Sequence, residues 1–473
     1  MEHHPQRAIP LHHYSAVLNS EDETHDIPRQ TPMLAAAILC CFIWVMFCAR
    51  GSTETIDVRK FGAKGDGKAD DTTAIQRAME TQGAMGGGVA HLPAGHYLVK
   101  SHLNIPSAVT LEGIWQAPPT ANRYTRATGT HTTISLLTGS VLLAVEGAGQ
   151  ENGAPFITLN PNSVLKGVTI FYPEQKKTNP PIAYPWTVQT AGCDNISIID
   201  VLMINPYQAV DFGTKVVGRH FIRNLYGQPL RRGLFIDLCL DIGRIENIHF
   251  WPFWTVADGE NSPTWKYMKE HGEAFIFGRS DWEYVTNCFA ISYKTGFHFL
   301  ANKRTDVYAG GGNYLLTQSG ADCCKTALLV DDTQGHSGIS FSNSQIYGDI
   351  IINDANRGKV SFTACNLFGS MDGAGGFATA RIDGKGRVTF SNCEFYCIDP
   401  KNKANTMLDC RGGRISVIGC DFINPDRETI KLGPDVISAI IANNEFRGKA
   451  NISNQATRKD KVAISGNIEE TGF

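Results

Sequence analysis

The sequence predicts an all-β chain that winds as a right-handed, single-stranded parallel β-helix, with a short N-terminal capping helix. The first observation is a pattern that recurs from about Leu165 to the end: alternating β-branched or aromatic residues, then Asn or Cys, then an apolar residue. From Ile339 onward the pattern returns every 21 to 28 residues. Strands this short are not stable alone, and such a period is typical of a solenoid whose coils stack on one another. A β-propeller would need repeats of about 40 residues.

The second observation is a set of cysteines at equal places in the late repeats. Cys365, Cys393 and Cys420 each follow an alternating run and precede an apolar pair. Stacked coils place equal positions ~4.8 Å apart. We therefore expect these three cysteines to form one internal ladder, packed as small apolar residues.

The third observation is the start of the repeat region. Residues 56–63 form an expected strand, followed by the turn 64–67 and by Asp70-Asp71, which can cap a helix. The apolar face of that helix would consist of Ala74, Ile75, Ala78 and Met79. Gly86-Gly87-Gly88 ends the helix before strands at 89–92 and 97–99. We expect the helix to cover the open end of the solenoid and its unpaired strand edge.

These residues carry a resemblance. The segment IDVRKFGAKGDGKADDTTAIQRAM…GGGVAHLPAGHYLV (56–99) resembles the opening module of the pectate-lyase-like β-helix superfamily. That superfamily includes polygalacturonase-type glycosidases, rhamnogalacturonases, alginate epimerases and phage tailspike depolymerases. The resemblance implies a secreted or surface protein that acts on polysaccharide, and homotrimers are common among such β-helices. Polygalacturonase-type enzymes carry N-T-D, D-D, H-G and R-x-K signatures, and this sequence contains no matching set.

Composition narrows the class of partner. The chain has 473 residues, and 43 basic residues against 46 acidic ones leave a net charge of −3. This balance argues against a nucleic-acid binder that works by neutralising phosphates. A single apolar stretch near the N-terminus excludes a polytopic membrane protein. The partner that the resemblance implies is a polysaccharide.

The N-terminal region divides the chain. We expect a polar tail at 1–32, a signal or membrane-anchor segment at 33–49, and a β-helix domain at 52–473 that opens with a cap module at 52–112. The apolar segment is at the lower limit of the ~20 residues that span a bilayer. Basic residues gather after it, which by the positive-inside rule would keep the remainder cytoplasmic. The resemblance instead favours a secreted or membrane-anchored, extracytoplasmic protein.

Aromatic residues gather in three long insertions, at 113–132, 172–186 and 251–272. Insertions at equal phase lie along one edge of a solenoid, so they are expected to wall a groove. Rigid aromatic faces bury large areas against the C–H faces of sugars. The alternative is that these side chains only pin down the loops. The residues are Trp115, Tyr184, Trp186, Trp251, Trp254, Trp265 and Tyr267.

Acidic residues mark the expected groove floor. Alternation places Val210 and Phe212 inside and Asp211 outside, and Asp211 shares an outward column with Phe235, Phe275 and His298. Asp237 lies one coil away and two residues further along, which gives roughly 8 Å between the two backbones. Inverting glycosidases hold their carboxyls ~6.5–9.5 Å apart. Asp211 and Asp237 are thus a candidate acid and base. Glu273 is a third nearby carboxylate, His298 and Arg232 are candidate binders of an anionic sugar, and Trp254 and Trp265 of a sugar ring.

A rival pair is Asp241 and Asp281. The runs 240–247 and 280–287 match in phase, so the two aspartates would stack on neighbouring coils, with Asp194 one coil further. A separation of roughly 5 Å suits a retaining pair or two carboxylates that share a proton or a cation. Alternatively, each aspartate bonds the backbone of its own turn.

Three functions follow from the sequence. The first is a hydrolase that cuts a glycosidic bond of an extracellular polysaccharide with two carboxylates. The second is a lyase or epimerase on a uronic-acid polymer, in which Arg231, Arg232, Lys294 or a bound Ca²⁺ neutralises the sugar carboxylate. The third is a non-catalytic glycan-binding β-helix. No Asp-rich nonapeptide repeat or His pair at helical spacing occurs in the solenoid, so no metal site and no cofactor are expected.

Overall fold

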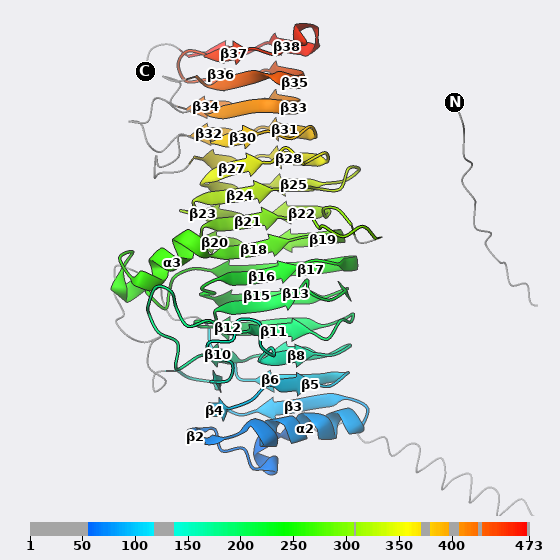
Figure 1. The fold of residues 1–473 in the computed structure, drawn as a ribbon, viewed down its shortest axis with the longest axis vertical. Coiled ribbons are helices and arrows are strands. Elements are labelled where there is room, and N and C mark those ends of the chain that lie inside the picture. The colour runs from blue at the N-terminus through cyan, green and yellow to red at the C-terminus, as the bar shows by residue number, and fades with distance from the viewer. Residues whose placement is uncertain are drawn as a thin grey trace, which may run out of the picture. The chain divides into compact units, whose positions relative to one another are not determined.

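The computed structural model describes residues 55–117, 137–306, 309–369, 379–396, 406–423 and 428–470. In these residues the chain winds upward as a stack of coils (Figure 1). Every pairing between the named strands is parallel, and each strand pairs with its counterpart in the neighbouring coil. The predicted parallel β-helix is therefore confirmed.

Three parallel sheets run the length of the solenoid. The first contains β1 (Ile56–Asp57), β3 (Gly88–Leu92), β6 (Val109–Gly113), β9 (Val164–Lys166), β12 (Ser197–Met203), β15 (Phe221–Gly227), β17 (Cys239–Phe250), β19 (Ser280–Thr286), β22 (Tyr314–Thr317), β25 (Ile339–Ser342), β28 (Lys359–Thr363), β31 (Arg387–Ser391), β33 (Leu408–Ile418), β35 (Ile430–Ala442) and β38 (Val462–Ser465). The short β14 (Val217–Gly218) also pairs with β17.

The second sheet contains β2 (Asp66–Asp70), β4 (Gly95–Val99), β7 (Ser140–Ala144), β10 (Thr169–Phe171), the ends of β12, β15 and β17, and then β20 (Phe289–Ile291), β23 (Gly320–Asp322), β26 (Gln345–Tyr347), β29 (Asn366–Phe368), β32 (Glu394–Tyr396), β34 (Asp421–Ile423), β36 (Glu445–Phe446) and β39 (Ile468–Glu469).

The third sheet, called here the site sheet, contains β5 (Leu103–Ile105), β8 (Ile157–Leu159), β11 (Trp186–Thr190), β13 (Gln208–Phe212), β16 (Arg232–Ile236), β18 (Glu273–Phe277), β21 (Thr295–Phe299), β24 (Thr326–Val330), β27 (Asp349–Ile352), β30 (Ala380–Ile382), the starts of β33 and β35, and β37 (Ile452–Asn454).

Helices lie at few points on this stack. Helix α2 (Thr72–Ala84) lies against the first coil, and α3 (Pro263–His271) flanks the middle coils (Figure 1). Short 3-10 turns are η1 (Val58–Phe61), η3 (Val256–Asp258) and η4 (Lys459–Lys461). In the described ranges no helix has the length and apolar character to cross a membrane. The apolar segment 33–49 lies outside those ranges.

The expected capping helix is confirmed. Ile75, Ala78 and Met79 of α2 are fully buried in the core. Asp70 precedes the N-cap residue Asp71 and accepts a hydrogen bond from the backbone N–H of Thr72, the first residue of the helix, at 3.1 Å. Asp71 does not cap it, because its carboxylate accepts the backbone N–H groups of Lys64 and Gly65 in the preceding turn.

The recurring Asn-Cys pattern forms a turn between the first and second sheets. The turn residue has left-handed backbone angles in coil after coil, which Asn tolerates better than most residues. The next residue points inward, and Cys365, Cys393 and Cys420 are buried there as the predicted ladder. The left-handed column contains Asp200, Asn224, Asn247, Asn287, Gln318, Asn343, Ala364, Asn392 and Asn443.

The site sheet departs from simple alternation at one point in each coil. Gln208, Arg232 and Glu273 are in register, and the last two are partly exposed. Two residues later, Val210, Leu234 and Phe275 fill the core. The residue between is small in six successive coils, and it lets the backbone bend. These small residues are Thr187, Ala209, Gly233, Ala274, Gly296 and Ala327, and all six are buried.

Candidate functional site

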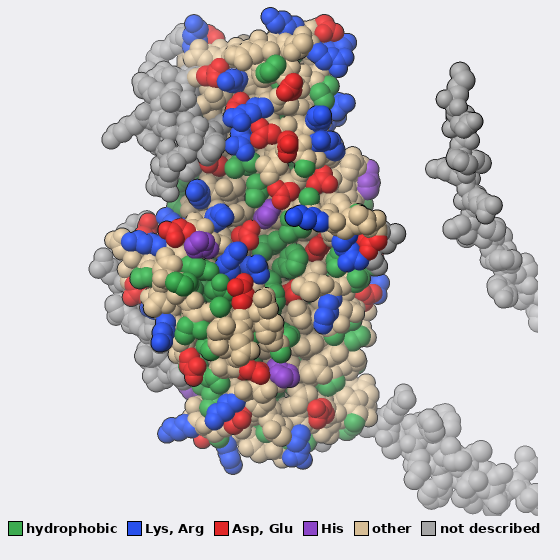
Figure 2. All heavy atoms as spheres, viewed as in Figure 1, with side chains coloured by type: hydrophobic (Ala, Val, Ile, Leu, Met, Phe, Trp, Pro, Cys, Tyr) green, Lys and Arg blue, Asp and Glu red, His purple; other side chains and the backbone are tan. Residues whose placement is uncertain are grey.

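The outer face of the site sheet carries an unusual concentration of charge. Basic, acidic and histidine side chains are interspersed over the coils of β16 to β27 (Figure 2). Side chains of β13, β16, β18, β21 and β24 line up across strands because the register of these coils is regular. Four of the residues that the sequence singled out lie on this outer face: Arg232, Phe235, Glu273 and His298.

The register of the predicted column is correct at three of its four positions. Asp211 pairs with Phe235, which pairs with Ile276, which pairs with His298. Phe275 was wrongly placed in this column, since it is fully buried and stacks on Phe297 with ring centroids 4.6 Å apart. The bend at Ala274 causes the error, because it shifts the phase by one residue after Glu273.

Asp211 is not exposed to the groove, contrary to expectation. Its side chain is fully buried. Oδ1 accepts the backbone N–H groups of Gly213 and Thr214 at 2.9 and 2.8 Å, and Oδ2 accepts Gln189 Nε2 at 2.6 Å. A carboxylate with this many donors serves to hold a turn. The predicted pairing of Asp211 with Asp237 as acid and base is therefore not supported by the position of Asp211.

Asp237 follows the end of β16 and has the surroundings of a proton donor. Its side chain is nearly buried. Oδ1 accepts the backbone N–H groups of Leu238 and Arg279 at 2.8 and 2.6 Å. The Asn302 amide lies 3.3 Å from both oxygens, and among the described residues it is the only hydrogen-bond donor to Oδ2. Burial raises the pKa of Asp237 above its usual value, although those hydrogen bonds act in the opposite sense. One oxygen is thus fixed and the other is held weakly.

A histidine lies between two carboxylates on the same face. His298 donates from Nδ1 to Glu273 at 3.0 Å and from Nε2 to Asp331 at 2.9 Å. Two carboxylate acceptors require both ring nitrogens to carry protons, so the ring is an imidazolium. Burial alone would lower the pKa of His298, but the hydrogen bonds to Asp331 and Glu273 raise it to about 9. The same contacts hold the pKa of both carboxyls below their usual values despite partial burial.

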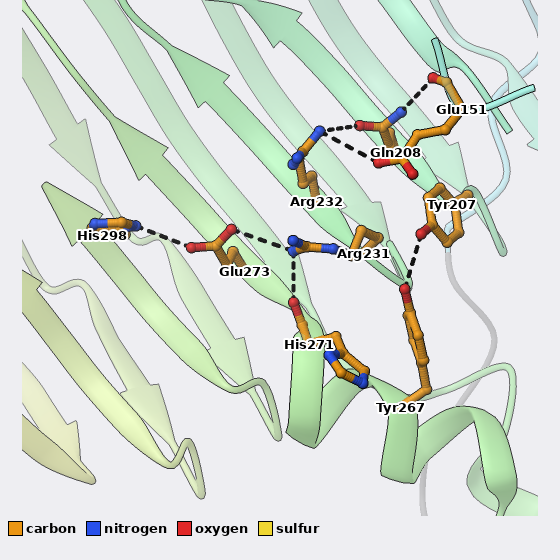
Figure 3. Close-up of polar contacts among 9 residues, drawn as sticks. All are labelled: Glu151, Tyr207, Gln208, Arg231, Arg232, Tyr267, His271, Glu273 and His298. Carbon is orange, nitrogen blue, oxygen red and sulfur yellow. Dashed lines mark hydrogen bonds and ion pairs between the residues drawn. The ribbon is translucent and has the colours of Figure 1, made fainter. Parts of the chain in front are cut away.

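Two arginines extend this charged group, Arg231 toward α3 and Arg232 toward Gln208 and Glu151 (Figure 3). Arg231 donates to the backbone oxygen of His271 at 2.6 Å and to Glu273 at 3.3 Å. Arg232 donates to Gln208 at 2.8 Å and lies 3.6 Å from Glu151. Both guanidinium groups are partly exposed and are held in place by these neighbours.

Helix α3 is anchored beside the arginines by a buried pair of tyrosines. The hydroxyls of Tyr207 and Tyr267 lie 2.9 Å apart (Figure 3). Three of the seven predicted sugar-stacking aromatics, Tyr184, Trp254 and Tyr267, are buried and so have an anchoring role. Trp265 is half-buried on α3, with its indole N–H enclosed. The alternative that these rings pin down the loops is therefore supported for the buried members.

The half-exposed aromatic side chains fall on two sides of the solenoid. Trp186 stacks on Phe235 of the site sheet, with an angle of 22° between the rings. Trp115 and Trp251 instead contact Tyr226 of the second sheet. The predicted single aromatic wall is therefore wrong, and only the Trp186–Phe235 pair borders the charged groups described above.

The rival pair of aspartates does not form a joint site. The predicted phase match holds from Ile242, which pairs with Trp282, but an irregularity precedes it. Asp241 bonds Arg219 at 3.1 Å, together with Asp194, whereas Asp281 bonds Arg279. Because each carboxylate has an arginine of its own, the two do not need a shared proton or cation.

A buried cluster that the sequence did not single out lies inside the solenoid. His220 Nε2 bonds Glu283 at 2.7 Å, and Cys239 Sγ lies 3.9 Å from His220 Nδ1. The ligand atoms of these three residues lie within 4.8 Å of one another, a spacing that suits a divalent metal ion. Ser280 also donates to Glu283, so the polar groups satisfy one another. The residues come from three consecutive coils, and their separation along the sequence hid the cluster.

Sequence reasoning also missed residues next to Asp237. Arg279, Asn302 and Asp331 each contact a predicted site residue. Arg279 and Asn302 lie shortly after β18 and β21, respectively, and Asp331 directly follows β24. From these places Arg279 and Asn302 contact Asp237, and Asp331 contacts His298. The alignment of the repeats predicts these three positions only if the bend in each coil is already known.

The sequence and the fold of this chain were compared with those of known proteins. Residues 55–228 match the family model described as "Rhamnogalacturonase A/epimerase, pectate lyase-like". This match covers the cap module and the first coils of the fold described above. Over these residues the chain is similar to the pectate lyase-like parallel β-helix family. The resemblance expected from residues 56–99 is thus confirmed.

Two curated relatives match a short segment of this chain. "Alginate lyase 7" and "Mannuronan C5-epimerase AlgE3" of Azotobacter vinelandii are each 56% identical over 43 residues, 9% of this chain. That segment spans 5% and 2% of their respective lengths. The N-terminal fragment of bacteriophage Phi29 gene product 12 is 13% identical with a TM-score of 0.52, covering 93% of this chain and 76% of that one. At this identity the likeness concerns the fold alone.

Proposed function

We propose that this chain is a carbohydrate-active enzyme that hydrolyses a glycosidic bond of a polysaccharide on the outer face of the site sheet. The observation that carries the proposal is Asp237. Its raised pKa, its fixed Oδ1 and its weakly held Oδ2 are the properties of a general acid. The family match and the epimerase and lyase relatives support a carbohydrate substrate.

In this mechanism the protonated Asp237 donates its proton to the glycosidic oxygen as the bond to the sugar breaks. Water then attacks the anomeric carbon and loses its proton to a second base. The Trp186–Phe235 pair offers an apolar surface for a sugar ring on the same face. His298, held as a cation, and Arg232 supply positive charge beside it.

A second candidate is a lyase or epimerase that acts on a uronic-acid polymer. The observation that favours it is the pair of partly exposed guanidinium groups of Arg231 and Arg232. Such groups neutralise a sugar carboxylate and so acidify its C5 proton. Because His298 donates both ring protons to carboxylates, it has no basic nitrogen and would support the arrangement by charge alone.

One digestion experiment separates the candidates. The full chain is incubated with a panel of neutral and uronic-acid polysaccharides, and both reducing ends and ultraviolet absorbance of unsaturated uronides are recorded. Reducing ends without absorbance are expected for the hydrolase. Absorbance would instead establish a lyase, and a changed sugar composition without either signal would establish an epimerase. Binding with no change in any polymer would overturn the proposed catalysis.

The proposed polysaccharide substrate lies outside cells, so we also propose an extracytoplasmic location.

A further inference from the structure

The register of three consecutive coils builds the buried cluster of His220, Cys239 and Glu283. Gly243 on β17 pairs with Glu283 on β19. His220 occupies the equal position one coil earlier, because the next residues of those two coils are paired. A Cβ atom at Gly243 would overlap Glu283 Oε1 and His220 Cε1. The glycine of the middle coil therefore lets two side chains from the outer coils meet across it.

A second pair of positions in the same coils adds a sulfur and a further oxygen. Cys239 on β17 pairs with Ser280 on β19. Cys239 Sγ lies 3.9 Å from His220 Nδ1, and Ser280 Oγ donates to Glu283 Oε2 at 3.0 Å. All four side chains are fully buried. Nitrogen, sulfur and oxygen donors of the kinds that bind zinc in proteins are thus gathered in one enclosed place.

We infer that this cluster holds one zinc ion, with His220, Cys239 and Glu283 as its ligands. Ligand atoms on a tetrahedral Zn²⁺ lie about 3.3–3.6 Å apart. The ligand atoms of the three residues lie within 4.8 Å of one another, and the shortest contact, His220 Nε2 to Glu283 Oε1, is 2.7 Å. Binding would widen that contact by about 0.6 Å and shorten the longer ones. Ser280, which already contacts Glu283, is the donor at hand for the fourth position.

Charge balance favours a divalent ion in this place. Charge in a dry interior is costly unless an opposite charge compensates it. Without metal the cluster is neutral, since one proton lies between His220 and Glu283 and the Cys239 thiol keeps its own. Zinc replaces both protons, which leave to solvent. The two charges of Zn²⁺ then balance one thiolate and one carboxylate beside a neutral imidazole, so the core stays neutral.

The ion would fasten three coils from inside the core. It is independent of the proposed function, because the cluster lies inside the solenoid and the candidate acid belongs to the site sheet. The ligands are enclosed, so the metal must enter while the coils close during folding. Experiments must therefore supply the metal during synthesis of the chain.

Metal content of the full chain tests the inference. The chain is produced with added zinc chloride, purified without chelator or polyhistidine tag, and measured by inductively coupled plasma mass spectrometry. About one zinc ion per chain is expected. Glu283→Gln keeps the hydrogen bonds to His220 and Ser280 but loses the charge, so zinc should fall about ten-fold or more, as in Cys239→Ala. Cys410→Ala, which removes an equally buried thiol on a later coil, is the matched control and should retain zinc.

Cobalt tests whether the thiol is a ligand. Co²⁺ can take the place of Zn²⁺, and a thiolate bound to it gives a charge-transfer band in the near ultraviolet. The chain produced with cobalt chloride is expected to show this band. The band should vanish in Cys239→Ala and Glu283→Gln. It should persist in Cys410→Ala and in Cys323→Ser, which lacks the exposed thiol.

Two results would overturn the inference. One is a wild-type chain that contains no zinc and shows no cobalt band. The other is zinc retained equally in Glu283→Gln and in Cys239→Ala, which would place the ion elsewhere on the chain. Should Cys239→Ala not fold, Glu283→Gln decides, because glutamine has the shape of the original side chain.

Discussion

Asp237 Oδ1 lies 2.6 Å from the backbone nitrogen of Arg279, which belongs to the next coil of the solenoid. This hydrogen bond joins the candidate proton donor to a residue of the neighbouring coil. A shift of one coil against the other would therefore break the bond and move Asp237 away from Arg279. Their relative position depends on coil stacking, which is the most extensively hydrogen-bonded feature of the fold.

Replacing Asp237 should remove most of the activity while preserving the fold. In Asp237→Asn the amide oxygen still accepts the backbone N–H groups of Leu238 and Arg279. Loss of a general acid lowers kcat by about 10²- to 10⁴-fold. The measurement is reducing-end release by variant and wild type at equal concentration. Asp241→Asn is the control, since that carboxylate is half-exposed and bonds Arg219 on the surface.

The same variant should change the pH profile. The acid form of Asp237 is the active one, so kcat/KM is expected to fall as pH rises through its elevated pKa. Asn does not titrate, and this alkaline limb should vanish from the residual activity of Asp237→Asn. A limb that persists at the same pH in the variant would assign the proton donor to another residue.

The His298 ion network should stabilise the protein in a defined pH range. Its folded-state pKa of about 9 exceeds the unperturbed 6.5, so its stabilisation is complete below the lower value and is lost as pH rises through the higher one. The difference corresponds to an upper bound of about 3 kcal/mol. His298→Gln should therefore lower the unfolding midpoint much more near pH 6 than near pH 10. Equal losses at both pH values would contradict a charged His298.

The two carboxylates of that network affect the stability of the protein at acidic pH. The pKa values of Glu273 and Asp331 are lowered in the folded state, so their contribution is present above their unperturbed values and is lost in acid. His298 loses its carboxylate partners as they become protonated. The stability gap between wild type and His298→Gln should thus also shrink below about pH 4.

Asp211 should contribute to stability and not to chemistry. Asp211→Ala leaves the N–H groups of Gly213 and Thr214 and the Gln189 amide without their acceptor. The expected cost is about 1–3 kcal/mol in the free energy of unfolding. Activity per folded molecule, corrected by the folded fraction from circular dichroism, should stay near that of wild type. A loss of two orders of magnitude in the folded variant would restore Asp211 as a catalytic candidate.

Gly243 makes room for the buried His220–Glu283 pair. A Cβ atom at this position would lie 2.0 Å from Glu283 Oε1 and 2.4 Å from His220 Cε1. Gly243→Ala is expected to cost about 1–3 kcal/mol, since both neighbours are fully buried and have little space to move. Thermal unfolding measures the loss. Gly335→Ala is the control, because a Cβ there would contact nothing within 4 Å.

The periodic parts of the fold were predictable because each coil repeats the same local demands. The Asn-Cys turn, the Cys365–Cys420 ladder and α2 all follow from residue type and spacing. The column through Phe235 and His298 was also predictable. Phe275 was misplaced because a bend at Ala274 interrupts alternation, and small residues in a strand do not reveal a bend by themselves.

Burial of polar groups was much harder to predict than register. Asp211 occupies the expected column, yet Gln189 and the turn at Gly213 enclose it. The clusters around His298 and His220 join residues 33 and 63 positions apart, respectively. Such contacts depend on which side chains bend toward one another across coils, and a single sequence contains no signal for that choice.

The burial of the cysteines offers a way to follow the unfolding of the β-helix. Seven of the nine described cysteines are buried, Cys193 is half-buried and Cys323 is exposed. Burial raises the pKa of the Cys288 thiol to about 12, so the reactive thiolate is scarce in the native state. Alkylating reagents should therefore label the buried cysteines slowly in the intact molecule and faster once the coils separate. Mass spectrometry of labelled peptides would then show which end of the stack frays first.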